Sequence, residues 1–187
     1  MPIFESMSNH GYDTTDYYAI RSSYGTIADL RDLVQAAETK NMRVVLDLVM
    51  NHVGSGHPWF SSTDSDERKD HWFVWSGSDL AWNKPWGGAG GSAVTWFGDP
   101  LEGVDRDANG QPHDDDFFYA VFSPSMPDFN YNDATARGEI IDEFTQVMRF
   151  WMEETRVHDF RYDAARYFVE NGRASDLHKD QTKTHAI

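Results

Sequence analysis

The stretch Val44–Met50 is apolar at every position except Asp47. A short run that is apolar on both faces is typical of a parallel strand covered on both sides. Burying an unpaired carboxylate is costly, so Asp47 needs a partner within the fold. We predict that this partner is Arg161, on a neighbouring strand.

Two longer segments repeat apolar residues at helical spacing. The first begins at Thr26, which is suited to cap a helix, with Asp29 in the capping-box position, and it ends near Asn41. The second begins at Asp133. The residues predicted to face the core are Ile27, Leu30, Leu33, Val34 and Ala37 in the first helix and Ile140, Ile141, Phe144, Val147, Met148, Trp151 and Met152 in the second.

A further strand is predicted over Val157–Asp163, followed by a helix over Ala164–Asn171 that Gly172 closes. Successive side chains of a strand alternate between faces, so Arg161 and Asp163 share one face. A cation and a carboxylate side by side at a strand end indicate either a functional rim or a structural ion pair.

The N-terminal part predicts a strand and a loop. Met1–Phe4 has the character of the end of a buried strand whose beginning is absent, so we expect the chain to be an internal piece of a longer one. With the helix and strand that follow, it suggests a right-handed β-α-β unit. Asn9–Tyr18 collects His, Tyr and Asp side chains, which favours a binding loop over a solvated one.

The character of the sequence changes between Gly54 and Asn130. This stretch holds six of the seven Trp and most of the Gly, and it predicts an irregular insertion packed by its own aromatic residues. Gly87–Gly91 is not a phosphate-binding loop, because neither a strand before it nor a helix after it is predicted.

Composition narrows the possible functions. With 16 Lys and Arg against 31 Asp and Glu, the net charge is −15, which disfavours nucleic acid and suits neutral substrates or cations. There is no cysteine, so disulfides and thiolate chemistry are excluded. No apolar run has the length of a membrane span, and no signal peptide is recognised after Met1. Localisation and oligomeric state stay open.

One acidic turn has the spacing of a calcium loop. Asp105, Asp107 and Asn109 stand at loop positions one, three and five, Gly110 at six, and Asp116 at twelve, where Glu is preferred. The alternative is an Asn-Gly hairpin turn with acidic neighbours, and the absence of flanking helical patterns favours it.

Four motifs together resemble the α-amylase family of retaining glycoside hydrolases. They are, in chain order, His10–Tyr17, Asp47–His52, Met126–Asn130 and Phe160–Ala165. The form Met-Pro-Asp-Phe-Asn at Met126–Asn130 is similar to members intermediate between the oligo-1,6-glucosidase and neopullulanase branches. The resemblance covers essentially the whole chain.

The resemblance implies an α/β fold, part of a (β/α)8 TIM barrel comprising strands two to four. Residues 1–53 would hold strand two, helix two and strand three, and residues 54–130 the inserted B domain. Residues 131–187 would hold helix three, strand four and the start of helix four. One departure is Asp159, where the family usually has Gly.

The resemblance also implies site residues. Asp163 would be the catalytic nucleophile, and Arg161 would keep it ionised, because a nearby cation favours the charged carboxylate. His52 would hydrogen-bond the sugar, Tyr12 would stack on it, and Asp13 would bind its hydroxyls.

A calcium ion is implied near Asn51 and Asp128, with a backbone oxygen near Tyr167. These positions match ligand positions of many α-amylases, although the oligo-1,6-glucosidase branch often lacks the ion. We predict this site ahead of the Asp105 loop. No organic cofactor is expected.

The family's general acid follows strand five, beyond the last predicted strand of this chain. We therefore expect a fragment of an enzyme acting on starch-like or maltooligosaccharide substrates, inactive by itself. The alternative is a non-catalytic carbohydrate-binding or scaffold member of the same fold; the co-occurrence of Arg161, Asp163 and His52 argues against it.

Overall fold

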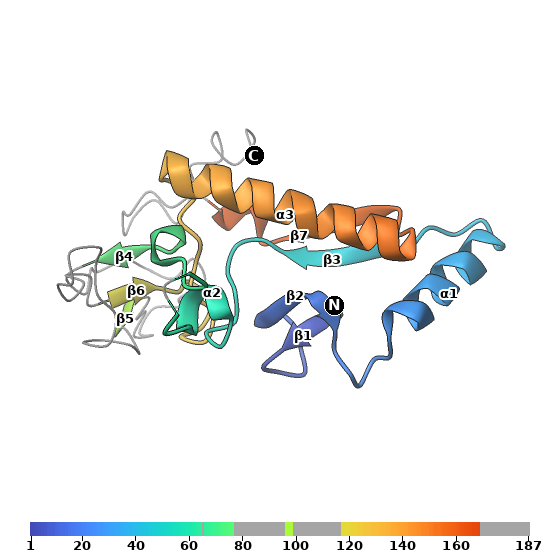
Figure 1. The fold of residues 1–187 in the computed structure, drawn as a ribbon, viewed down its shortest axis with the longest axis horizontal. Helices are drawn as coiled ribbons and strands as arrows, with labels where there is room; N and C mark the ends of the chain where they lie inside the picture. The colour runs from blue at the N-terminus through green and yellow to red at the C-terminus, as the bar shows by residue number, and fades with distance from the viewer. Residues whose placement is uncertain (65, 77–95, 99–116, 169–187) are drawn as a thin grey trace, which may run out of the picture.

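A computed structural model describes residues 1–64, 66–76, 96–98 and 117–168 (Figure 1). The elements, in chain order, are β1 (Phe4–Ser6), β2 (Thr14–Ile20), α1 (Ile27–Glu38), β3 (Val45–Val49), α2 (Pro58–Ser61), the 3-10 helix η1 (Asp70–Trp72), β4 (Trp75–Ser76), β5 (Trp96–Gly98), β6 (Phe117–Tyr119), α3 (Ala134–Thr155), β7 (Asp159–Asp163) and the 3-10 helix η2 (Ala165–Tyr167). None of the described helices is long and apolar enough to cross a membrane.

The parallel pair β3–β7 lies at the centre of the chain's fold. Its register sets Asp47 opposite Arg161 and Val49 opposite Asp163. The prediction that Asp47 and Arg161 lie on adjacent parallel strands is confirmed. Both strands run toward the same edge, so the polar residues that follow them meet there.

The N-terminal hairpin differs from the prediction. Residues 14–18 were expected in a loop, but they belong to β2, which pairs antiparallel with β1 through an irregular register. Thr14, Thr15, Tyr17 and Tyr18 are residue types that favour strands, and their polar groups obscured this preference. In the described part of the chain β1 is hydrogen-bonded to β2, and no ladder joins it to β3, so the strands of the expected β-α-β unit are not paired directly there.

Helix α1 begins as the sequence predicts. Thr26 Oγ1 accepts a hydrogen bond from the Asp29 N–H at 3.2 Å, and the Asp29 carboxylate accepts from the Thr26 N–H at 2.8 Å. Beyond the helix, Asn41 adopts a positive φ of 57°, consistent with its predicted role as a stop. The core-facing stripe is narrower than predicted, because Leu33 is 57% exposed.

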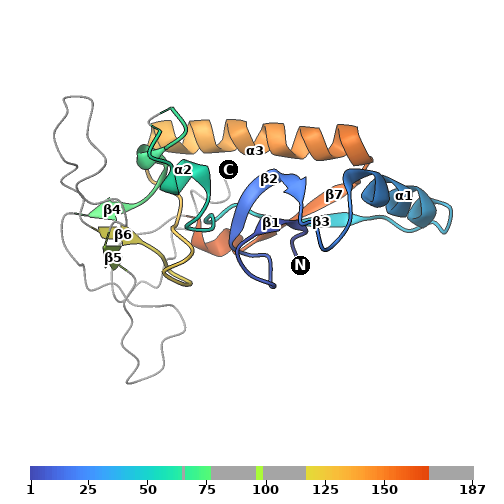
Figure 2. The same cartoon turned by 60° about the horizontal axis from the view of Figure 1, so that its bottom comes forward.

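Helix α3 spans 22 residues from the N-cap Asp133, whose carboxylate accepts hydrogen bonds from the N–H groups of Thr135 and Ala136. The predicted stripe is confirmed in its centre, since Ile140, Phe144, Val147 and Trp151 are fully buried, whereas Met152 at its edge is half exposed. Figures 1 and 2 show α1 near one end of α3 and the small sheet β4–β6–β5 beyond the other.

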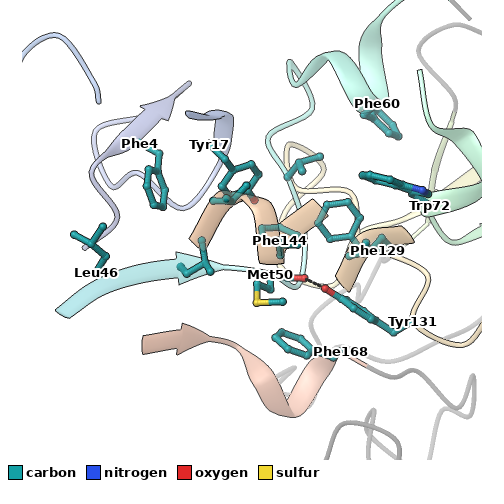
Figure 3. Close-up of a cluster of buried hydrophobic side chains, with 14 of the residues drawn as sticks. Phe4, Tyr17, Leu46, Met50, Phe60, Trp72, Phe129, Tyr131, Phe144 and Phe168 are labelled. Carbon is teal, nitrogen blue, oxygen red and sulfur yellow. Dashed lines mark hydrogen bonds between the residues drawn. The ribbon is translucent and has the colours of Figure 1, made fainter. Parts of the chain in front are cut away.

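Aromatic side chains from separate elements fill the core (Figure 3). Trp151 of α3 donates its indole N–H to the Tyr17 carbonyl of β2 at 2.7 Å. Tyr131 donates to the Met50 carbonyl at 2.6 Å, so the end of β3 is bound to the segment before α3. In the insertion, Phe118 of β6 packs edge-on against Phe60 of α2 with ring centres 5.0 Å apart.

The helix expected after β7 starts differently. Ala164, predicted as its first residue, has a left-handed φ of 54°, and a short 3-10 helix follows. The turn at Ala164 redirects the chain immediately after Asp163. The predicted end of this helix at Gly172 and the candidate ligands Asp105, Asp107 and Asn109 lie outside the described residues.

Candidate active site

An open pocket of about 430 Å³ lies beyond the carboxyl ends of β3 and β7. Five of its lining residues come from the predicted motifs, and two come from the segment between β6 and Met126. The lining residues are His10, Tyr12, His52, Phe122, Ser123, Met126 and Asp163. The sequence offered little signal for Phe122 and Ser123, because they follow β6 in a segment without periodicity.

Asp163 and Asp47 share one cation. Arg161 Nη1 lies 2.5 Å from Asp163 Oδ1 and 2.7 Å from Asp47 Oδ1. The hydrogen bond to Asp47, together with the negative charges of Asp163 and Asp47, raises the pKa of Arg161 above its usual range. The guanidinium is therefore a permanent positive charge beside the Asp163 carboxylate.

Tyr12 joins the loop after β1 to this charged group. Its hydroxyl donates to Asp47 Oδ2 at 3.2 Å. Partial burial, and then the charge of Asp47, raise the pKa of Tyr12, so the phenol stays protonated and keeps this hydrogen bond. Its ring forms part of the pocket wall, where the prediction placed a sugar-stacking surface.

His52 lies behind Tyr12 and is almost completely buried. Its Nε2 is 3.0 Å from the Tyr12 carbonyl, and because a carbonyl only accepts, Nε2 carries the proton. Burial lowers the pKa of His52 to about 4, so the ring is neutral at pH 7. The His52 ring therefore lines the pocket while its N–H is hydrogen-bonded to the Tyr12 carbonyl of the loop.

Asn51 and Asp128 are brought together as predicted. The Asn51 amide donates to Asp128 Oδ1, and the Val121 N–H donates to Asp128 Oδ2 at 2.6 Å. Asn51 Oδ1 is buried without a hydrogen-bond partner. Tyr167 packs edge-on against Phe122, with the ring centres 5.4 Å apart.

The unpaired Asn51 oxygen beside a carboxylate fits a hard cation, which prefers oxygen ligands. Calcium takes six to eight oxygens, and the two side chains provide only part of such a set. In the described residues, no cluster of three or more His, Cys, Asp or Glu is placed to hold a metal. Backbone carbonyls and water would have to complete the coordination.

Asp13 is placed differently from its predicted role. It is 3% exposed, it does not line the pocket, and its Oδ1 accepts hydrogen bonds from the N–H and the hydroxyl of Ser8 at 3.1 and 2.7 Å. The carboxylate thus organises the loop from within. Motif spacing gave no indication of this, because it does not show which side of a loop a carboxylate faces.

The chain resembles known proteins over nearly its whole length. The protein-family model for the alpha amylase catalytic domain matches residues 1–186. Alpha-amylase 3 of Dictyoglomus thermophilum is 34% identical over 179 residues, covering 91% of this chain and 29% of that protein. The 4-alpha-glucanotransferase of Thermotoga neapolitana is 31% identical over 170 residues, covering 89% of this chain and 34% of that protein.

A crystal structure of the alpha-amylase from H. orenii resembles the fold with a TM-score of 0.69 at 31% identity, and the match covers 95% of this chain and 32% of that one. The chain therefore spans about a third of the length of these relatives.

Proposed function

Since the chain belongs to the α-amylase family, as part of its α/β barrel catalytic domain, we propose that it supplies the nucleophile of a retaining α-glucosidic active site. The observation that carries this is the Asp163 carboxylate, which lines the pocket and lies 2.5 Å from the Arg161 cation. A carboxylate paired with a cation at a strand end is suited to attack an anomeric carbon.

The reaction proceeds in two displacements. Asp163 bonds to the anomeric carbon while the glycosidic oxygen leaves with a proton from a general acid, giving a covalent glycosyl-enzyme. Water or a sugar hydroxyl then attacks that carbon and releases Asp163, with the same acid group now acting as base. Water gives hydrolysis and a sugar hydroxyl gives transfer.

The proton donor is not in the described pocket wall. Of the lining residues, only Asp163 carries a carboxylate, and retaining enzymes need a second one about 5–5.5 Å away. Asp47 is committed to Arg161 and Tyr12. We propose that the acid belongs to a longer protein, so the isolated chain does not cleave starch or maltooligosaccharides.

The substrate is an α-glucan or a maltooligosaccharide. Tyr12 offers an aromatic face in the pocket, and a neutral sugar meets no repulsion from a chain of net charge −15. Names of the relatives, alpha-amylase and 4-alpha-glucanotransferase, support this class of substrate and both outcomes of the second displacement.

The finer assignments follow the motifs. We propose that the chain contains barrel strands two to four, in segments 1–53 and 131–187, and that these segments flank an inserted domain at 54–130. We also propose membership of the branch intermediate between oligo-1,6-glucosidases and neopullulanases, on the Met126–Asn130 motif. Asn51, Asp128 and a backbone oxygen near Tyr167 are the proposed calcium ligands; the bound ion would tie the segment before α3 to the end of β3.

A labelling experiment tests the nucleophile. The chain is incubated with a fluorinated α-glucosyl fluoride that reacts but turns over slowly, since fluoride leaves with little help from an acid. Mass spectrometry of a digest should find the glucosyl group on Asp163. The Asp163→Asn variant should remain unlabelled.

Asp159→Asn is the matched control, because Asp159 is exposed on the same strand and pairs with Arg43. It should be labelled like the unmodified chain. Maltooligosaccharide binding without any label at Asp163 would instead favour the carbohydrate-binding alternative.

A further inference from the structure

Arg21 follows β2 directly and reaches the loop between β1 and β2. Its guanidinium donates through Nη1 to the Ser8 carbonyl and through Nη2 to the Asn9 side-chain oxygen at 3.0 Å. One side chain therefore holds two successive residues of the loop. None of the predicted motifs contains Arg21.

Tyr24 reinforces the same contact. Its hydroxyl donates to the Asn9 carbonyl at 3.3 Å, and its ring lies 5.9 Å from the Arg21 guanidinium carbon, within cation–π range. The turn that positions Tyr24 is closed by a hydrogen bond from its N–H to the Arg21 carbonyl at 2.8 Å. Arg21 and Tyr24 thus bind the loop as one unit.

The loop is held on its other side by Asp13. The Asp13 carboxylate accepts from the Ser8 N–H and hydroxyl, while the Ser8 carbonyl accepts from Arg21. Ser8 is therefore bound on one side by the buried Asp13 carboxylate and on the other by the Arg21 guanidinium. The loop conformation at Ser8 is therefore fixed from both sides.

The residues just beyond Ser8 and Asn9 face the pocket. His10 and Tyr12 line it, and His10 Nδ1 accepts the Tyr12 N–H at 3.1 Å. Tyr12 in turn bonds His52 through its carbonyl and Asp47 through its hydroxyl. These contacts link Ser8 and Asn9, through Tyr12, to the groups around Asp163.

We propose that Arg21 is a positioning residue for the sugar-binding wall of the pocket, acting through Ser8 and Asn9 on Tyr12; the proposal rests on the function proposed above. A planar guanidinium is suited to this role, because its donors diverge at a fixed angle toward two acceptors. A lysine offers one flexible ammonium and replaces only part of the contact.

The test compares four variants of the 187-residue chain by amide hydrogen exchange. In Arg21→Ala, the amides of Met7, Ser8 and Tyr12 should exchange about tenfold faster, the factor expected for the loss of a hydrogen bond from a charged donor. Arg21→Lys and Tyr24→Phe should fall between this variant and the unmodified chain.

Arg31→Ala is the matched control. Arg31 also donates to a carbonyl and an acceptor side chain, but on Glu154 at the far end of α3. It should leave the three loop amides unchanged. The imidazole N–H signal of His52, read by nitrogen NMR, should move in Arg21→Ala and not in Arg31→Ala.

Loop amides and a His52 signal unchanged in Arg21→Ala would overturn the proposal, whatever happens to global stability. If Arg21→Ala does not fold, the lysine and phenylalanine variants decide by the same two measurements. These measurements need no sugar, so their failure is distinct from failure of Asp163 to be labelled, which bears on the proposed function alone.

Discussion

At the scale of single residues, Asp47 is the group on which the pocket's charge arrangement depends. It is the one charge in an otherwise apolar strand, and its two oxygens bind Arg161 and Tyr12. The sequence predicted the first contact because a buried carboxylate needs a partner. It did not predict the second, since no pattern links position 12 to position 47.

Replacing Asp47 by Asn should weaken both contacts. We expect the free energy of unfolding to fall by about 1–2 kcal/mol, at the low end of the range for hydrogen bonds to charged groups, because Arg161 is solvent-exposed. Urea titration measures this. Asp159→Asn removes a pair between exposed side chains and should cost about 0.5 kcal/mol or less; equal losses would contradict the special position of Asp47.

Buried histidines predict a dependence of stability on pH. Burial lowers the pKa of His52 to about 4 and of His57 to about 3, whereas unfolded histidine has a pKa near about 6.5. Below about pH 6.5 the unfolded chain binds protons that the folded chain does not. The stabilisation is complete above that pH and is lost as the pH falls toward 4.

The variant His57→Asn isolates one of these protons. His57 caps α2 by accepting the Trp59 N–H at 3.1 Å, and Asn keeps a capping acceptor without titrating. Between pH 6 and 4 the slope of unfolding free energy against pH should decrease by about 1.4 kcal/mol per pH unit. Parallel curves for the two proteins would contradict the prediction, because they would mean that His57 binds its proton equally well in the folded and the unfolded chain.

At the scale of elements, periodicity and caps predicted what the chain determines locally. The start of α1 at Thr26 and of α3 at Asp133 depends on side chains within a few residues of each other. Strand β2 was missed because its pairing with β1 depends on contacts across the loop. Leu33 was predicted to face the core, but α1 turns it outward, since helical spacing alone does not set the width of a buried stripe.

Two glycines test where elements approach closely. A Cβ on Gly54 would lie 2.4 Å from the Asp13 carbonyl oxygen, because the segment after β3 passes directly against β2. Gly54→Ala should therefore destabilise the fold by about 1–3 kcal/mol. Gly138 in α3 has open space, so Gly138→Ala should stabilise by up to about 1 kcal/mol. In thermal unfolding, the midpoint temperature should fall in Gly54→Ala and rise in Gly138→Ala.

At the scale of the whole molecule, the net charge of −15 opposes compaction and attracts cations without any specific site. Calcium is therefore expected to raise the unfolding temperature in two ways. Screening should be reproduced by magnesium at equal ionic strength. Only coordination at Asn51 and Asp128 should raise the unfolding temperature further with calcium than with magnesium. A calcium concentration of a hundred times the Kd adds about 2.7 kcal/mol to the free energy of unfolding.

Thermal unfolding with each ion and with a chelator separates the two effects. The calcium-specific part should vanish in Asp128→Asn, while the shared part should remain. Identical shifts with calcium and magnesium, in both proteins, would leave screening as the whole explanation and remove the predicted site.

The long excursion between β3 and α3 leaves and returns at neighbouring points. His52 forms a β-bridge with Asp128, and the Val53 N–H donates to the Pro127 carbonyl at 3.3 Å. Because the two ends are joined by the backbone itself, the distance that the intervening chain must span does not depend on its length. Doubling such a loop costs only about 0.6 kcal/mol in closure entropy. Evolution, or an engineer, is thus able to exchange the segment between these two points for another module while Asp47, Arg161 and Asp163 keep their places; the pocket wall formed by Phe122, Ser123 and Met126 is exchanged with it.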